Sequence, residues 1–361
     1  MTNKRVRHNL ENLGFDKQFY QDLDFNKLSE FEIARVVSVH KDRFTINDGE
    51  HEVSAELTGK QLLNSNSAFD YPVVGDWVLA KLHNEGDFSI IHSILPRKSL
   101  LKRKTSGKKI DFQLIAANID TVLIMQSLDS NFNLRRLERY LVMVNDHNIH
   151  PVVLLSKSDL MTPKNIEDRV DKIHEIMPNL QVEIFSNKRV NGLETIKNLL
   201  SPKKTYCLLG SSGVGKTTLL NNLIGKDVFV TKKVREKDGR GRHATTYRQL
   251  IKLDSEAIII DTPGMRELGN FSIKKGLDEA FSDIKALSKK CKFNNCTHSH
   301  EKGCAVLGGL KNGKLSAKRH QNYIKMNKEA AHNEMSYIEK RQKDKQFAKF
   351  CKQVMKYKKN S

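Results

Sequence analysis

Short stretches of alternating hydrophobic and polar residues dominate the early part of the chain. Five of them, separated by polar turns, predict β-strands. They cover residues 33–39, 43–47, 52–57, 76–82 and 89–95. Because five short strands this close together are typical of a small closed sheet, we expect an N-terminal β-barrel of the OB-like type.

The segments that flank these strands are polar. Residues 1–28 are polar and charged, with Leu10, Leu13 and Phe15 as the only hint of a short helix, so we expect much of this arm to be mobile. Residues 96–109 (PRKSLLKRKTSGKK) form a basic linker that faces either solvent or phosphate. Within the barrel, Phe44 and Tyr71 suit either base stacking or the core, and aromatic residues of small barrels more often lie in the core.

After the linker, apolar runs alternate with amphipathic stretches at helical spacing. The runs predict buried strands at residues 121–125, 151–155, 182–185, 205–209 and 256–260. The amphipathic stretches predict helices at residues 134–144, 166–176, 193–200 and 218–225. This alternation indicates an α/β nucleotide-binding domain, in which ligands bind at the carboxyl ends of the strands.

The strand at residues 205–209 leads into the complete spacing G-x-x-x-x-G-K-[ST]. The residues of this stretch are Gly210, Ser211, Ser212, Gly213, Val214, Gly215, Lys216, Thr217 and Thr218. A strand before and a helix after it are the context of a phosphate-binding loop, in which backbone N–H groups and the helix N-terminus face a triphosphate. We expect Lys216 to meet the β and γ oxygens, Thr217 to ligate Mg²⁺ and Thr218 to contact the phosphates nearby. A glycine turn without a ligand would not require all of these positions.

Two further stretches suit the chemistry of phosphate and Mg²⁺. The last predicted strand ends in D-T-P-G, so Asp261 would hold Mg²⁺ and the N–H of Gly264 would sense the γ-phosphate. Between this turn and the phosphate loop lie residues 239–246 (GRGRHATT), a polar loop that we expect to be flexible without ligand. Thr245 or Thr246 would complete Mg²⁺ coordination when the loop closes.

The order of the motifs is circularly permuted. A base-reading motif, S-K-S-D at Ser156, Lys157, Ser158 and Asp159, lies upstream of the phosphate loop, whereas ordinary GTPases place N-K-x-D downstream of it. With the leading barrel, G-R-H-x-T-T, D-T-P-G-M-R-E-L and a trailing Cys/His cluster, the chain from about residue 30 to residue 330 resembles ribosome small-subunit-dependent GTPase A. The resemblance implies a bacterial GTPase that binds the small (30S) ribosomal subunit and its rRNA. It also implies that the bound subunit stimulates hydrolysis of GTP to GDP, and that the protein acts late in the maturation of the subunit.

The base-reading residues depart from the usual pattern at two positions. Ser156 replaces the usual Asn and reaches less far, and Ser186-Asn187 stands where Ser-Ala is usual. Asp159 can accept from the guanine N1–H and 2-amino groups, the Lys157 stem can cover the base, and a backbone N–H at Ser186 and Asn187 can meet O6. We expect GTP rather than ATP, because adenine would leave the carboxylate unpaired.

Hydrolysis requires a group that positions water, and Ras-like enzymes use a Gln just after D-x-x-G. This chain has Met265 there, so the intrinsic rate should be slow. The resemblance suggests His243 as the replacement, acting with Lys216 and Gly264; the alternative is a solvated loop histidine or one that touches RNA phosphate. The chain leaves this domain soon after residue 268, so loss of the γ-phosphate could reorient the C-terminal domain.

A cluster of cysteine and histidine follows, with the spacing C-x₄-C-x-H-x₅-C. Its members are Cys291, Cys296, His298 and Cys304. Three thiolates and one imidazole complete a tetrahedral shell without an open position, which predicts one structural Zn²⁺. His300 is a competing ligand, and free thiols are the alternative to a metal site.

The charge balance indicates an anionic partner. The 361 residues include 62 Lys and Arg against 42 Asp and Glu, a net charge of +20. Such an excess favours nucleic acid or an anionic membrane surface, but the apolar runs are too short to span a bilayer. Residues 339–361 carry nine Lys and Arg against two acidic residues, and we favour an RNA-bound amphipathic helix over a solvated tail. The N-terminus lacks a secretory pattern, so we expect a cytoplasmic protein.

These patterns predict three domains in a monomer. We expect an arm, barrel and linker at residues 1–105, a circularly permuted GTPase at 106–272, and a mainly helical zinc-binding domain with a basic tail at 273–361. Two other functions stay open. A non-enzymatic GTP-sensing RNA-binding assembly factor would show no activation of hydrolysis, and an ATP-using P-loop enzyme would prefer adenine.

Overall fold

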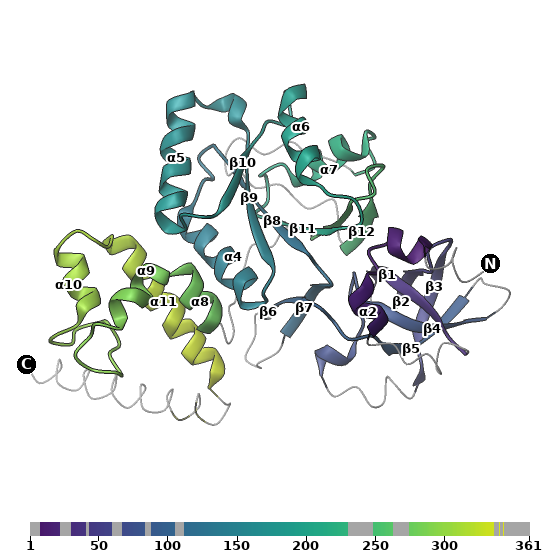
Figure 1. Cartoon of the computed structure of the whole chain (residues 1–361), viewed down its shortest axis with the longest axis horizontal. Helices are drawn as coiled ribbons and strands as arrows, with labels where there is room; N and C mark the ends of the chain where they lie inside the picture. Colours follow the sequence, from purple (N-terminus) through teal and green to yellow (C-terminus); the bar gives the residue numbers. More distant parts are fainter. Residues whose placement is uncertain are drawn as a thin grey trace, which may run out of the picture. The chain divides into compact units, whose positions relative to one another are not determined.

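The computed structural model describes most of the chain in two compact units (Figure 1). The described residues are 8–21, 30–40, 43–59, 67–83, 88–104, 112–229, 248–262, 274–335, 339 and 342. The first unit comprises Met1–Arg103 and Phe112–Leu268, and the second comprises Lys104–Asp111 and Gly269–Ser361. No helix in the described parts combines the length and apolar character needed to cross a bilayer.

Five strands near the N-terminus close into a barrel, as predicted. They are β1 (Glu32–His40), β2 (Arg43–Asn47), β3 (Glu52–Leu57), β4 (Trp77–His83) and β5 (Phe88–Ile94). Each strand pairs with its neighbour in the order β1-β2-β3-β5-β4, and β4 pairs back with β1. Phe44 is 4% exposed and belongs to the barrel core, whereas Tyr71 is 37% exposed. The core alternative is therefore correct for Phe44.

The described part of the N-terminal arm is folded against the barrel, so the expectation of mobility is wrong for residues 8–21. The buried side chains of this segment are Leu10, Leu13, Phe15 and Phe19. They pack with Trp77, Leu79 and Leu95 of the barrel. Phe15 meets the Trp77 ring edge to face, with centroids 4.7 Å apart. Few apolar residues suffice here because two of them are aromatic and bury a large area each.

A parallel sheet follows the barrel and carries the predicted strands and helices. Its strands are β8 (Thr121–Ser127), β9 (His150–Ser156), β10 (Gln181–Ile184), β11 (Thr205–Gly210) and β13 (Ile258–Asp261), in the order β10-β9-β8-β11-β13. The helices are α4 (Leu134–Asp146), α5 (Pro163–Ile176), α6 (Val190–Leu199) and α7 (Lys216–Ile224). Side chains of α6 and α7 share one core with alternate residues of β8, β9 and β11. The carboxyl ends of the five strands thus meet at one edge.

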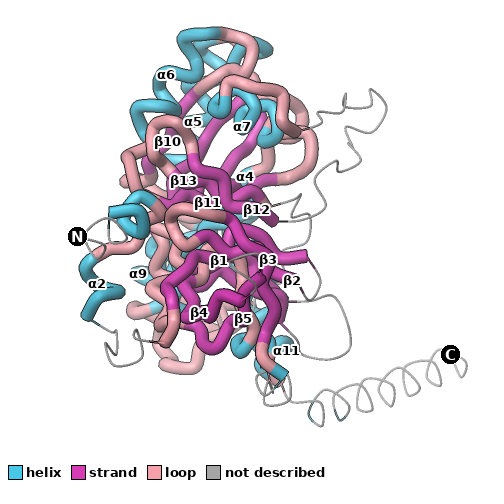
Figure 2. Tube along the Cα trace, turned by 90° about the vertical axis from the view of Figure 1, so that its right-hand side faces the viewer, coloured by secondary structure: helices cyan, strands magenta, loops and turns pink. Residues whose placement is uncertain are grey.

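The barrel and the parallel sheet are joined by backbone hydrogen bonds. Strand β12 (Arg248–Lys252), which the sequence pattern did not predict, runs antiparallel to both β13 and β1. The result is one sheet of eleven strands, whose continuity Figure 2 shows. The predicted basic linker is partly a strand, since β6 (Leu100–Lys104) pairs with β7 (Phe112–Ala117).

The second unit is mainly helical, as predicted. Its described helices are α8 (Lys274–Ala280), α9 (Ser282–Ser288), α10 (Ala305–Lys311) and α11 (Ala317–Glu334). Arg319 of α11 donates to both carboxylate oxygens of Asp283 in α9, at 2.8 and 2.7 Å, and lies over the Phe281 ring. This bidentate pair holds α11 against α9. Most of the basic tail at residues 339–361 lies outside the described residues.

Arg35 of β1 connects the arm, the barrel and the parallel sheet. The residue is 1% exposed, and its guanidinium donates to the carbonyls of Leu13, Gly75 and Asn118. It also donates to the Thr205 hydroxyl of β11 at 2.9 Å. Burial lowers the pKa of Arg35 to about 10, so the group keeps its charge at neutral pH.

Replacing Arg35 with methionine should destabilise the first unit. Arg35→Met removes the Arg35 donor from the carbonyls of Leu13 and Asn118, whereas the Gly75 carbonyl keeps Asn118 Nδ2 at 3.0 Å. We expect the free energy of unfolding to fall by about 3–5 kcal/mol. Arg43→Met is the matched control, because Arg43 lies on the neighbouring strand in an exposed pair with Glu56 at 3.8 Å. That variant should change stability by less than about 1 kcal/mol. Chemical denaturation of both variants makes the measurement, and equal losses would contradict the role of Arg35.

Candidate functional site

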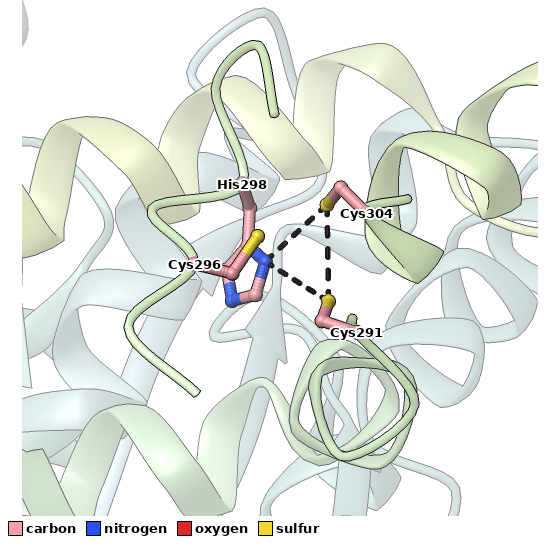
Figure 3. A group of neighbouring side chains, drawn as sticks. All are labelled: Cys291, Cys296, His298 and Cys304. Atoms are coloured by element: carbon pink, nitrogen blue, oxygen red, sulfur yellow. Dashed lines mark hydrogen bonds between the residues drawn. The ribbon is translucent and has the colours of Figure 1, made fainter. Parts of the chain in front are cut away.

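The four predicted metal ligands lie together in the loop between α9 and α10 (Figure 3). The ligand atoms of Cys291, Cys296, His298 and Cys304 all lie within 4.8 Å of one another, and they form the one such thiol and imidazole group among the described residues. His298 presents Nδ1 to the cluster, whereas its backbone carbonyl accepts from His320 Nε2 at 2.8 Å. His300, the competing ligand, is exposed and is not a member.

The spacing of these atoms fits a tetrahedral zinc ion. His298 Nδ1 lies 3.6 Å from Cys291 Sγ and 3.5 Å from Cys304 Sγ, and the two sulfur atoms are 3.9 Å apart. Zinc bonds to sulfur and nitrogen give tetrahedral edges of about 3.8 Å for two sulfurs and about 3.6 Å for sulfur and nitrogen. The donor set and its geometry therefore suit a closed structural site.

The phosphate-loop sequence forms a tight turn between β11 and α7. Strand β11 is fully buried between β8 and β13, and the helix begins at Lys216. Gly215 has φ 99°, and a Cβ there would lie 2.8 Å from Asn187 Nδ2. A Cβ at Gly210 would lie 2.5 Å from the Met125 carbonyl oxygen. Only glycine allows the loop to pass this close to its neighbours.

Lys216 lies under the loop with a buried ammonium group. It is 8% exposed, and Nζ donates to the carbonyls of Gly210 at 2.8 Å and Ser211 at 2.9 Å. Burial lowers the pKa of Lys216 to about 8. Burial also raises the pKa of Asp261, which ends β13 at the same sheet edge, although the charge of Lys216 opposes that rise. A lysine with carbonyl partners alone can exchange them for the oxygens of an anion.

Two side chains from neighbouring strand ends hold further carbonyls of the loop. Ser156, although shorter than asparagine, donates to the Val214 carbonyl at 2.6 Å. Asn187 Nδ2 donates to the Gly215 carbonyl at 3.2 Å. Asn222 of α7 donates in turn to the backbone carbonyl of Asn187 at 3.2 Å. The N–H and C=O of a trans peptide point in opposite directions. The N–H groups that follow these two carbonyls therefore point away from Ser156 and Asn187.

The carboxylate of the base-reading motif is ionised and held in place. Lys157 adopts a left-handed conformation with φ 60°, and the 3₁₀ turn Ser158–Leu160 follows it. Asp159 Oδ1 accepts from the Ser186 hydroxyl at 2.6 Å. This hydrogen bond is the chief reason why the pKa of Asp159 lies below its usual range. An ionised, oriented carboxylate is the acceptor that a pair of ligand N–H donors requires.

The predicted nucleotide residues that the structure describes meet at one sheet edge. Ser156 ends β9 and Lys157 to Asp159 follow it, while Ser186 and Asn187 follow β10. Gly210 ends β11 and the rest of the phosphate loop follows it, and Asp261 ends β13. Thr217 and Thr218 lie in the first turn of α7. Four predicted residues lie outside the described parts of the chain: His243, Thr245, Thr246 and Gly264.

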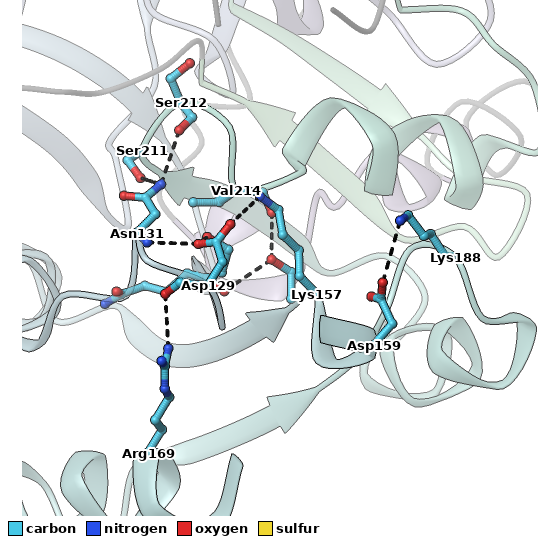
Figure 4. A network of polar contacts seen from close by, with 12 residues as sticks. Asp129, Asn131, Lys157, Asp159, Arg169, Lys188, Ser211, Ser212 and Val214 are labelled. Carbon is cyan, nitrogen blue, oxygen red and sulfur yellow. Dashed lines mark hydrogen bonds and ion pairs between the residues drawn. The ribbon is translucent and has the colours of Figure 1, made fainter. Parts of the chain in front are cut away.

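Sequence reasoning missed Asp129 and Asn131, which follow β8 at the same edge. Figure 4 shows them between Lys157 and the serines of the phosphate loop. Asp129 Oδ2 accepts from Lys157 Nζ at 2.7 Å, and Asn131 Nδ2 donates to Ser211 Oγ at 3.3 Å. These residues match no motif. The position of β8 between β9 and β11 is the signal that could have found them.

Comparisons with known proteins agree with this arrangement. A family model described as RsgA GTPase matches residues 94–271. A relative from Vibrio parahaemolyticus, named small ribosomal subunit biogenesis GTPase RsgA 2, is 36% identical over 96% of this chain and 92% of its own length. The crystal structure of YjeQ from Thermotoga maritima is similar with a TM-score of 0.59 and 26% identity, covering 82% of this chain and 97% of that chain. YloQ, described as a circularly permuted GTPase, has the same fold with a TM-score of 0.57 at 23% identity, over 85% of this chain and 98% of its own.

The geometry of the Cys and His cluster at residues 291–304 predicts that each chain binds one zinc ion. His298→Ala should lose the ion and loosen the second unit, because a ligand and the closed shell are lost together. His300→Ala, a change two residues away, should retain it. Elemental analysis after dialysis measures the metal, and limited proteolysis measures the loosening. Zinc retained by His298→Ala, or lost from His300→Ala, would contradict the assignment.

Proposed function

Because this chain belongs to the RsgA GTPase family, we propose that it binds GTP at this sheet edge and hydrolyses it to GDP and phosphate on the small ribosomal subunit, late in maturation. One observation carries the proposal: the base-reading motif and the phosphate loop, far apart in sequence, are joined by the hydrogen bond from Ser156 to Val214. A site for a base and a site for phosphates thus share one edge of the sheet.

The phosphate end of the site combines one lysine with oxygen ligands. Lys216 would exchange the carbonyls of Gly210 and Ser211 for the β and γ oxygens of the nucleotide. Thr217, with Asp261 and with Thr245 or Thr246, would hold Mg²⁺. When bound, this ion neutralises charge on the β and γ oxygens.

The base end of the site favours guanine. Asp159, oriented by Ser186, can accept from the guanine N1–H and 2-amino groups, whereas adenine offers its carboxylate no matching pair of donors. The Lys157 stem would cover the base. A backbone N–H beside Asn187 would meet O6.

Hydrolysis would proceed by attack of water on the γ-phosphorus, in line with the bond to the β-γ bridging oxygen. That bond breaks, the electron pair leaves with GDP, and the water loses a proton to solvent or phosphate. Met265, where Ras-like enzymes have Gln, cannot orient the water, so basal turnover would be slow. His243 would supply that orientation, and the N–H of Gly264 would contact the γ-phosphate.

Contact with the subunit would reach the site through the sheet. The loop of residues 239–246 ends just before β12, where Arg248 pairs with Val39 of the barrel strand β1. A net charge of +20 suits a protein that binds rRNA, and the basic tail would be one contact. The protein would act in the cytoplasm as a monomer. Because β12 pairs with the barrel strand β1 and directly follows the loop that contains His243, a subunit bound to the barrel would act on this loop. This pairing supports the proposed stimulation of hydrolysis by the subunit.

A hydrolysis assay with GTP and ATP, with and without purified small subunits, tests the proposed function. We expect slow turnover of GTP alone, a large stimulation by subunits and little turnover of ATP. His243→Ala should lose the stimulation while its affinity for GTP is unchanged.

Each alternative function has its own outcome in the same assay. GTP-dependent RNA binding without stimulation would indicate the non-enzymatic assembly factor. A preference for ATP would indicate the P-loop enzyme of another class. Stimulation that survives in His243→Ala would remove that residue from the mechanism.

The pKa of Lys216 predicts that nucleotide binding takes up a proton in mild alkali. In the free protein this pKa is about 8, and phosphate oxygens beside the ammonium would raise it. Below the free value both states are protonated, so affinity does not depend on this group. Above it the free lysine is neutral, and affinity should fall by up to about tenfold per pH unit.

Calorimetry in buffers of different ionisation enthalpy measures this uptake. Binding of GDP just above the free pKa should take up a fraction of one proton in the wild-type protein and none in Lys216→Ala. The same uptake in both proteins would show that another group is responsible.

A further inference from the structure

The loop of residues 128–133, between β8 and α4, leaves the sheet between the strand of the base-reading motif and the strand of the phosphate loop. Strand β8 pairs in parallel with β9, which carries the base-reading motif, and with β11, which carries the phosphate loop. The register places Ser127 beside Ser156 and Met125 beside Gly210. The loop that leaves β8 therefore starts between the two halves of the proposed site.

Asp129 uses its two carboxylate oxygens for different partners. Oδ2 accepts from Lys157 Nζ at 2.7 Å. Oδ1 accepts from the Ser127 hydroxyl at 2.7 Å and from the backbone N–H of Asn131 at 2.9 Å. Burial raises the pKa of Asp129, but the hydrogen bonds from Lys157 and Ser127 outweigh it and hold the pKa below its usual range. One oxygen thus shapes the loop and the other holds the lysine.

The loop is braced on both sides, so Asp129 is a fixed anchor. Gln126 and Asn133 exchange two hydrogen bonds across its ends, at 3.2 and 3.0 Å. Arg169 of α5 donates to the Asp129 carbonyl at 3.2 Å and lies over the Phe132 ring at 4.8 Å. These contacts define the position of the Asp129 carboxylate before any ligand binds.

The same loop touches the phosphate loop. Asn131 Nδ2 donates to Ser211 Oγ at 3.3 Å and to the Ser212 carbonyl at 3.4 Å (Figure 4). Asn131 also has its own backbone fixed, because its carbonyl accepts from Arg136. The loop thereby links the base-reading lysine to the phosphate loop through side chains.

We propose that Asp129 is a positioning residue of the guanine-nucleotide site, which holds Lys157 in the conformation that covers the base. This inference rests on the proposed function. A lysine stem is flexible, and ordering such a side chain during binding weakens affinity by roughly three- to tenfold. The ion pair with Asp129 removes that loss by ordering Lys157 in advance.

Asp129→Asn isolates this role. The amide oxygen can keep the two hydrogen bonds from Ser127 and Asn131, while the NH₂ group that replaces Oδ2 cannot accept from Lys157. Asp120→Asn is the matched control at the other end of the strand, where Asp120 pairs with Lys204 at 3.1 Å and accepts from the Thr205 N–H at 2.8 Å. Both variants replace one carboxylate that binds a lysine and a backbone N–H.

Titration of a fluorescent GDP and a fluorescent non-hydrolysable GTP analogue with Mg²⁺ gives the test. Asp129→Asn should raise both dissociation constants by the same factor, roughly three- to tenfold, because the γ-phosphate is not involved. Asp120→Asn should bind as the wild type does. Wild-type affinity in Asp129→Asn would overturn the inference, and a wild-type protein that ignores guanine nucleotides would overturn the proposed function instead.

A double-mutant cycle with Lys157→Met separates positioning from a general loss of structure. If Asp129 acts through Lys157, then Asp129→Asn should add no further loss of affinity in the Lys157→Met background. A loss that adds fully to that of Lys157→Met would overturn the inference, whatever either change does to the melting temperature.

Discussion

A phosphate loop can face an anion with its N–H groups only if the carbonyls on its other side find donors of their own. In this chain the donors are side chains from the loop itself and from the ends of three neighbouring strands. They are Asn131 for Ser212, Ser156 for Val214 and Asn187 for Gly215, whose carbonyl also accepts from the N–H of Leu219. Lys216 serves the carbonyls of Gly210 and Ser211 until an anion takes their place. The order of the strands brings these donors to one place, and the rest of the site depends on it.

Circular permutation leaves this arrangement intact because it depends on neighbours in the sheet and not on the order of the chain. Strands β9, β8, β11 and β13 lie side by side although β9 precedes the phosphate loop in sequence. What the permutation changes is the surroundings of the site. Strand β12, which follows the loop of residues 239–246, is clamped between β13 and the barrel strand β1. Strand β12 therefore links the parallel sheet to the barrel through backbone hydrogen bonds.

The sequence was sufficient for the features that local pattern determines. Apolar runs identified the buried strands, and the rule that ligands bind at strand ends brought Ser156, Asp159 and Ser186 to the phosphate loop. The four residues of the predicted zinc site were identified from their spacing, and the structure brings their ligand atoms together. Their fit to zinc needs only short-range loop geometry, which the sequence of one loop encodes.

The features that were missed depend on contacts between distant segments. Residues 8–21 look polar by pattern, yet Phe15 is buried because Trp77, distant in sequence, offers it a partner. No pattern in the sequence indicates the buried role of Arg35, because its acceptors in the arm and the parallel sheet lie far from it along the chain. Asp129 belongs to no motif, and only the pairing of β8 with β9 brings it to Lys157.

The proposed function, hydrolysis of GTP on the small ribosomal subunit, implies that the γ-phosphate of the bound nucleotide controls the affinity of the protein for the subunit. Sedimentation of the protein with purified small subunits, at fixed salt and with either GDP or a non-hydrolysable GTP analogue, measures that affinity directly. The account predicts markedly tighter binding with the analogue. Equal binding in the two nucleotide states would contradict it.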